Sequence, residues 1–250
     1  MSLRFSFPDA REWRYIISSL AALIEEASFI ATSEGLSLRA LDPSRVAMVD
    51  LFVPREAFEE YELEGEKVTI GVNFNELEKV VKRGKADERI VFEIREGRLR
   101  ITILGKAERR FSLPLLDIVS EELPTPKVTF TVNAKLLSDT LKEALSDAQL
   151  VSDYIRFEAE ENNLWLKAQS DRGEVETRLS LEDGSLLEYD ITEKAVASYS
   201  LEYLSDIVKK ADRVSDIAGL AFSSNKPIEL TFEFTGGGRL RYYLAPSLET

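Results

Sequence analysis

The chain of 250 residues contains no cysteine and no histidine, and only two methionines and two tryptophans. Without cysteine there is no disulfide framework, no thiol nucleophile and no thiolate ligand for a metal. Without histidine there is no imidazole base and no Ser/His/Asp triad, and most zinc sites are excluded. Any catalysis would therefore have to use carboxylate, lysine, tyrosine or magnesium chemistry.

Long hydrophobic runs are also lacking. No apolar stretch approaches the roughly 18 residues of a membrane span, and the first residues lack the basic-then-apolar pattern of a signal peptide. We therefore expect an intracellular, DNA-accessible protein with no membrane partner. The hydrophobic fraction of 44% suffices for one large core or two of about half that size.

A short pattern that occurs four times organises the chain. A turn residue precedes a leucine that opens an alternating apolar run, at Leu36, Leu99, Leu164 and Leu240. Each copy predicts a hairpin turn followed by a strand. The second and fourth copies share a Gly-Arg before the leucine, whereas the first and third do not. This alternation indicates two halves, each with two units.

Each unit begins with a strand pattern followed by an amphipathic helix. Asp9 and Asn75 are expected to cap the first two helices, because a side-chain oxygen at that position accepts a hydrogen bond from the first turn. We expect strands over residues 4–7, 68–74, 128–132 and 197–201, and helices over residues 9–24, 75–82, 133–145 and from about 201 to 211. The predicted class is α+β, with two similar domains, each of two β-α-β-β-β units, and with the helices gathered on one face of the sheets.

Residues 113–127 separate the halves. Three prolines and several acidic residues in this stretch predict an exposed connector without regular structure. We therefore expect an N-terminal domain at residues 1–116, a connector at 117–127 and a C-terminal domain at 128–250.

The net charge of −13 is unevenly distributed. Residues 9–23, 75–85, 134–147 and 201–213, which cover the expected helices, contain 11 basic and 10 acidic residues, so the rest of the chain sums to −14. If the basic residues share faces, the helices present a cationic surface on an acidic body, although a solvated helix face is the simpler alternative. The basic residues of the helices are Arg11, Arg14, Lys79, Lys82, Arg83, Lys85, Lys135, Lys142, Lys209, Lys210 and Arg213.

Such a surface would contact phosphate and read no bases. The sequence has no recognition-helix cluster, no zinc finger and no aromatic ribonucleoprotein motif. The expected binding to duplex DNA is weak, salt-sensitive and independent of sequence.

Other candidate sites are weaker. Residues 236–238 are three glycines, but they lack the Gly-Lys-Ser/Thr ending of a phosphate-binding loop and predict a hairpin turn. The acidic pairs at residues 25–26 and 121–122 have no second set of ligands at magnesium spacing. We expect no metal, no cofactor and no catalytic constellation.

Four segments resemble a known family. They are residues 41–49 (LDPSRVAMV), 71–82 with Gly-Val-Asn-Phe and Lys-Val-Val-Lys, 201–204 (LEYL) and 240–246 (LRYYLAP). The chain resembles the sliding clamps of eukaryotes and archaea, the proliferating cell nuclear antigen family. The resemblance implies a ring of three chains and six similar domains, with helices lining a channel for duplex DNA. By position it implies channel residues Arg14, Lys79, Lys82, Lys142 and Lys209, to which the helix faces add Arg11, Arg83 and Lys210.

The resemblance also implies a groove for short partner peptides. Its residues would be Leu41, Arg45, Val46, Met48, Leu123, Pro124, Pro227, Tyr243, Leu244, Ala245 and Pro246. The implied partners are DNA polymerase, flap endonuclease, DNA ligase and a clamp loader ATPase, which dock through motifs with spaced apolar and aromatic anchors.

Two edge segments, residues 108–113 and 174–181, would join neighbouring chains head to tail. The implied interface residues are Arg109, Arg110, Phe111, Ser112, Val175, Glu176, Thr177, Arg178 and Leu179. The sequence leaves open whether the ring is a homotrimer or a heterotrimer. It thus predicts a non-enzymatic DNA sliding clamp and polymerase processivity factor. The alternatives are a subunit of a heterotrimeric or checkpoint-type clamp that acts as a partner-specific scaffold, and a magnesium-dependent enzyme.

Overall fold

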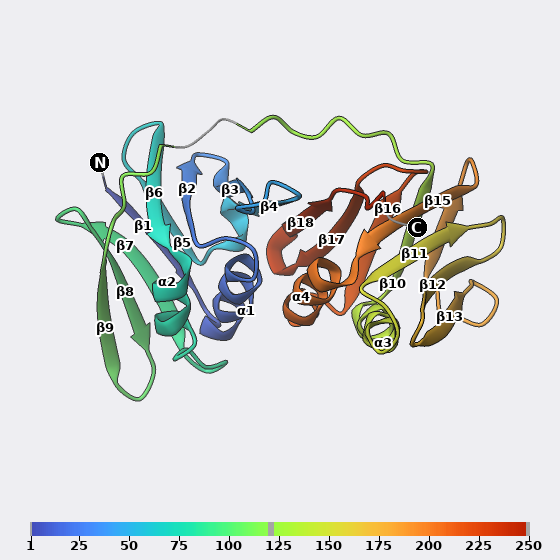
Figure 1. Cartoon of the computed structure of the whole chain (residues 1–250). Coiled ribbons are helices and arrows are strands. Elements are labelled where there is room, and N and C mark those ends of the chain that lie inside the picture. Colours follow the sequence, from blue (N-terminus) through green and yellow to red (C-terminus); the bar gives the residue numbers. More distant parts are fainter. Residues whose placement is uncertain (1, 120–122, 249–250) are drawn as a thin grey trace. The chain divides into compact units, whose positions relative to one another are not determined.

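The computed structural model describes residues 2–119 and 123–248, which divide into two units (Figure 1). Unit 1 comprises Met1–Pro43, Val49–Leu123 and Phe234–Leu240. Unit 2 comprises Ser44–Met48, Pro124–Glu233 and Arg241–Thr250.

Unit 1 is built from antiparallel strands and two helices. Helices α1 (Ala10–Ala21) and α2 (Phe74–Val81) pack against each other, and a 3₁₀ turn covers Arg55–Ala57. One sheet has the order β5-β1-β7-β8-β9, formed by Glu60–Leu63, Leu3–Phe7, Arg89–Arg95, Arg98–Leu104 and Glu108–Pro114. Strands β4, β3, β2 and β6 lie side by side in that order and span Ala47–Pro54, Gly35–Leu41, Glu26–Thr32 and Lys67–Asn73.

Unit 2 repeats these parts. Helices α3 (Ser138–Gln149) and α4 (Leu201–Ala211) pack against each other. A four-stranded sheet has the order β13-β12-β11-β15, formed by Gly173–Leu179, Leu164–Ser170, Tyr154–Ala159 and Ala195–Ser200. The order β14-β10-β16-β17-β18 corresponds to Glu188–Ile191, Val132–Leu137, Ile217–Phe222, Ile228–Phe234 and Gly238–Leu244.

Each helix pair buries one face. In α1 the buried residues Trp13, Ile16, Ile17 and Leu20 recur at three- and four-residue spacing, as expected of a helix with one apolar stripe. Trp13 meets an aromatic cluster in which its ring centroid is 4.9 Å from that of Phe92. Burial of this stripe leaves the opposite, polar face of the helix in solvent.

The four predicted hairpin turns are confirmed in position. Each of Leu36, Leu99, Leu164 and Leu240 lies at or near the start of a strand, in β3, β8, β12 and β18. The predicted cap Asp9 is also confirmed, because its Oδ1 accepts a hydrogen bond of 2.8 Å from the Arg11 amide.

The predicted cap Asn75 is wrong. Helix α2 already begins at Phe74, and Asn73 is the cap, since its Oδ1 accepts a 3.0 Å hydrogen bond from the Glu76 amide. Asn75 lies inside the first turn, where its side chain is exposed. The two asparagines are two residues apart, and the end of β6 decides between them.

The prediction for the third unit is displaced by about five residues. Residues 128–131 are outside any strand, β10 covers Val132–Leu137, and the helix begins at Ser138 rather than at residue 133. Val132, Ala134 and Leu136 are buried and alternate with exposed residues, which is the period of a strand. Lys135, expected on the helix, therefore lies on β10 and forms an ion pair of 3.0 Å with Glu188.

The predicted break begins slightly later than expected. Strand β9 continues to Pro114, which is tolerated because β9 has a strand partner on one side only. Leu116 then forms a single bridge with Gly71, and residues 123–130 have no regular structure. The acidic pair at 121–122 lies outside the described residues. Among those that are described, no helix is long and apolar enough to cross a membrane.

Candidate nucleic-acid interface

The solvent-facing sides of α1 and α2 carry cations in unit 1. Lys79 and Lys82 point away from the buried stripe of α2, and their side chains are 70% and 51% exposed. Arg83 is exposed just after the helix ends. On α1, the Arg14 guanidinium lies 4.9 Å from the centroid of the Tyr15 ring and donates a 3.1 Å hydrogen bond to its hydroxyl.

Local carboxylates hold several of these cations loosely. Lys79 pairs with Glu76 at 2.6 Å and Lys82 with Glu78 at 3.0 Å, both along the same helix. Arg11 pairs with its own cap residue at 3.0 Å. Exposed pairs of this kind contribute about 0–1 kcal/mol, so a phosphate group can replace the carboxylate at little cost.

The helices of unit 2 carry a second cationic surface, in which one lysine differs from the others. Lys142 lies between two carboxylates, with Nζ 2.6 Å from Asp139 Oδ1 and 2.7 Å from Asp212 Oδ2. The hydrogen bonds to Asp139 and then to Asp212 raise the pKa of Lys142. Lys209 and Lys210 are exposed in the last turn of α4, where the helix dipole favours positive charge.

The expected groove residues divide between exposed and buried positions. Within unit 2, Val46 is 37% exposed, and its carbonyl accepts a 2.9 Å hydrogen bond from the amide of Ala245, which is also exposed. Met48, Tyr243 and Leu244 are buried, at 7%, 7% and 2% exposure. The buried side chains therefore support this surface, and a partner can reach mainly Val46 and Ala245.

The remaining groove residues lie on separate segments. Arg45 and Pro124 are exposed, and Pro246 and Pro227 are half-buried. In unit 1, Leu41 is half-buried at the end of β3, and the Leu123 carbonyl accepts a 2.9 Å hydrogen bond from Arg39 Nη1.

The two expected interface segments are sheet edges. Within the described part of the chain, β9 pairs only with β8 and β13 only with β12. Arg110 and Ser112 on β9 are exposed, and Phe111 is half-buried. Arg109, however, points into its own unit, where Nη2 lies 2.6 Å from Glu88 Oε2.

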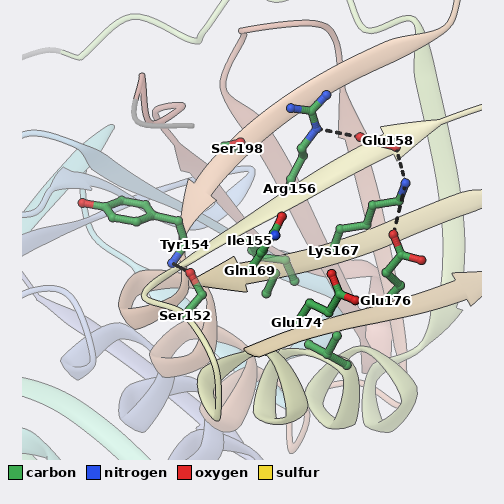
Figure 2. Close-up of a pocket in the computed structure, with 12 residues that line it drawn as sticks. Ser152, Tyr154, Ile155, Arg156, Glu158, Lys167, Gln169, Glu174, Glu176 and Ser198 are labelled. Atoms are coloured by element: carbon green, nitrogen blue, oxygen red, sulfur yellow. Dashed lines mark hydrogen bonds and ion pairs between the residues drawn. The ribbon is translucent and has the colours of Figure 1, made fainter. Parts of the chain in front are cut away.

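The β13 edge belongs to a polar sheet face (Figure 2). Glu158 accepts from Arg156 at 2.6 Å and from Lys167 at 2.8 Å, and Lys167 also lies 3.4 Å from Glu176. These residues border a shallow hollow of about 450 Å³. The hydrogen bond from Lys167 lowers the pKa of Glu158. The other expected interface residues of β13 are Val175, Thr177, Arg178 and Leu179, of which only Leu179 is buried.

The triple glycine is a turn, as expected. Gly236 and Gly237 lie between β17 and β18 with φ of 77° and 82°, a backbone conformation that favours glycine. No group of three or more acidic side chains suited to a metal ion occurs among residues 2–119 and 123–248.

Two units of the same construction, each with a helix pair beside antiparallel sheets and cations on the outer helix faces, define a DNA-clamp fold. A family profile described as the proliferating cell nuclear antigen N-terminal domain matches residues 3–117. The chain belongs to the DNA polymerase sliding clamp family, whose members are non-catalytic processivity factors. The sequence-based prediction of family and fold class is confirmed.

Several known proteins are similar over nearly the whole chain. The DNA polymerase sliding clamp of Thermofilum pendens is 55% identical and covers 99% of this chain and 100% of its own. The sliding clamp of Pyrococcus abyssi is 40% identical over 100% of both chains. The crystal structure of PCNA from Thermococcus kodakaraensis has a TM-score of 0.93 at 32% identity and covers 98% of this chain and 100% of its own. A chain of the PCNA2-PCNA3 complex from Sulfolobus tokodaii has a TM-score of 0.91 at 33% identity, with the same coverage.

Proposed function

We propose that this chain is a DNA sliding clamp and polymerase processivity factor that closes with two further chains into a ring around duplex DNA. The observation that carries the proposal is similarity to sliding clamps over 99% of the chain. The cations on the outer faces of both helix pairs support it independently. The ring itself performs no chemistry, and a clamp loader ATPase would open it.

Retention on DNA would depend on enclosure more than on affinity. A closed ring cannot leave the duplex sideways, so weak phosphate contacts suffice and leave the clamp free to slide. Lys79 and Lys82 suit this role, since each can exchange an exposed carboxylate for a phosphate. The expected channel set remains Arg11, Arg14, Lys79, Lys82, Arg83, Lys209 and Lys210, with Lys142 as a weak contributor.

The unpaired edges of β9 and β13 would join neighbouring chains head to tail. Such pairing satisfies backbone groups that would otherwise invite aggregation. Because one structural relative is a complex of two different clamp chains, a ring of unlike subunits is the second candidate. We retain the boundaries 1–116, 117–127 and 128–250 as the proposed domains and connector.

Partner enzymes would dock at the surface that contains Val46 and Ala245. DNA polymerase, flap endonuclease, DNA ligase and the clamp loader are the proposed partners. Aromatic and apolar anchors of a short peptide would cover the exposed part of Val46, while Tyr243 and Leu244 stabilise the surface from below.

The mass of the purified chain in solution tests the ring. A trimer supports a self-assembling clamp, whereas a monomer or dimer that trimerises only with sister chains supports the second candidate. Failure to trimerise under either condition would contradict both.

A second experiment tests the channel. The double change Lys79→Ala and Lys82→Ala should shorten retention on closed circular DNA without affecting peptide docking. The matched control is Lys67→Ala with Lys194→Ala, which removes the same charge from exposed positions outside the helices. Equal retention of the two double variants would sink the assignment.

A further inference from the structure

Glu88 is a buried carboxylate in the loop that joins α2 to β7. Its side chain is only 11% exposed, although it lies two residues from the exposed end of a basic loop. A buried carboxylate is costly unless it is paired and hydrogen-bonded. Its partners therefore indicate why it is there.

Three segments of unit 1 meet at Glu88. Its Oε2 accepts hydrogen bonds from Arg109 Nη2 on β9 at 2.6 Å and from the Lys85 amide at 3.0 Å. Its backbone carbonyl accepts a 2.8 Å hydrogen bond from the amide of Ala10, the first residue of α1. The β8–β9 turn closes on the same carboxylate, since a Cβ at Gly105 would lie 2.7 Å from Oε1.

Arg109 fixes the loop at a second point. Its Nη1 donates a 3.2 Å hydrogen bond to the carbonyl of Arg83, so one guanidinium holds both ends of the loop from residue 83 to 88. The planar fork of arginine suits two acceptors in fixed directions, which a lysine cannot match. Gly84 brings the loop against α1, because a Cβ there would lie 2.7 Å from the Cβ of Ala10.

The loop held in this way carries cations of the proposed channel. Arg83 and Lys85 are exposed on it, and Arg11 lies one residue beyond the α1 amide that Glu88 binds. An exposed loop that is fixed in advance loses less conformational entropy when it contacts a ligand.

We propose that the Glu88–Arg109 ion pair is a positioning device for phosphate contact: it holds Arg83 and Lys85 beside the first turn of α1. This rests on the proposed function, in which these cations contact DNA. Because Arg109 belongs to β9, the same pair ties the basic loop to the edge strand proposed to join the next chain.

The change Glu88→Gln separates positioning from simple electrostatics, because the two predict opposite signs. Removing a negative charge beside a cationic surface should by itself strengthen DNA binding. Loss of positioning should weaken it, by about eightfold at 0.1 M salt for each phosphate contact given up, since each contributes about 0.9 to the slope of log K against log salt. The expected result is weaker binding of a fluorescent 30-base-pair duplex, a smaller salt slope and faster amide exchange at residues 83–88.

Two controls complete the experiment. Glu108→Gln makes the same chemical change at an exposed residue and should not weaken binding. Arg109→Lys keeps the charge but cannot serve both acceptors, and it should reproduce Glu88→Gln, whereas Arg110→Lys on the exposed side of β9 should not. Arg109→Lys also decides the question if Glu88→Gln does not fold.

The outcomes separate the two proposals. If the unchanged protein does not bind or retain DNA at all, the proposed function fails. If it binds DNA, but Glu88→Gln and Arg109→Lys bind equally well or more tightly as trimers of unchanged mass, the positioning proposal is wrong.

Discussion

Lys142 matches a channel position in the family, yet the structure predicts that it adds little to DNA binding. Its ammonium group contacts Asp139 and Asp212 at 2.6 and 2.7 Å, so the three groups together carry a net charge of −1. A phosphate that approaches Lys142 must displace both carboxylates and approach two negative charges. Lys79, by contrast, has one exposed partner.

The expected magnitudes follow from this difference. Lys79→Gln should lower the slope of log K against log salt by about 0.9, which is roughly a 3.5-fold change in affinity ratio between 50 and 200 mM salt. Lys142→Gln should lower it by less than about 0.3. It should instead reduce stability by about 1–3 kcal/mol, because Asp212 is only 9% exposed and would be left with Arg213, whose Nε is 4.0 Å away.

Two measurements on the same variants check this. Salt titration of duplex binding gives the slope, and urea denaturation gives the free energy of unfolding. The change Asp212→Asn should raise the slope by freeing Lys142. If Lys142→Gln lowers the slope as much as Lys79→Gln does, or leaves stability unchanged, the reasoning is refuted.

Three further predictions concern docking, pH dependence and the core. Val46→Asp should abolish binding of an apolar-anchored peptide measured by calorimetry, while Leu150→Asp, a change at another exposed leucine, should not; equal affinities would contradict the docking surface. The folded-state pKa of Glu158 is lowered, so its pair with Lys167 should stabilise the fold by about 0.5 kcal/mol above about pH 4.5 and lose this as pH falls through the folded value, and Glu158→Gln should flatten acid unfolding curves in that range. Trp13→Ala should cost about 3–5 kcal/mol in urea unfolding, and Trp13→Phe clearly less, because the buried indole N–H has no acceptor among the described residues and its loss removes a desolvation cost; similar costs would argue against this account.

The parts of the fold that follow from neighbouring residues could be predicted from the sequence. The four turn-leucine patterns placed hairpins correctly because strand alternation and turn chemistry act over a few residues. Asp9 was recognisable as a cap for the same reason. Where two local signals competed, prediction failed: Asn73 and Asn75 are equally good caps, and the segment of β10 has a strand period that an asparagine at residue 133 obscures.

The roles of single charges depended on contacts between distant segments. The acidic partner of Lys142 on α4 is 70 residues away, and Arg109 reaches a carboxylate 21 residues earlier. No periodicity encodes such pairs, since they form only when two elements pack. The sequence alone therefore determined the absence of thiol and imidazole chemistry, the fourfold repeat and the location of positive charge on helices. Only the tertiary structure decided which of those charges remain available to DNA, because packing brings carboxylates from other elements within 3 Å of some and leaves others in solvent.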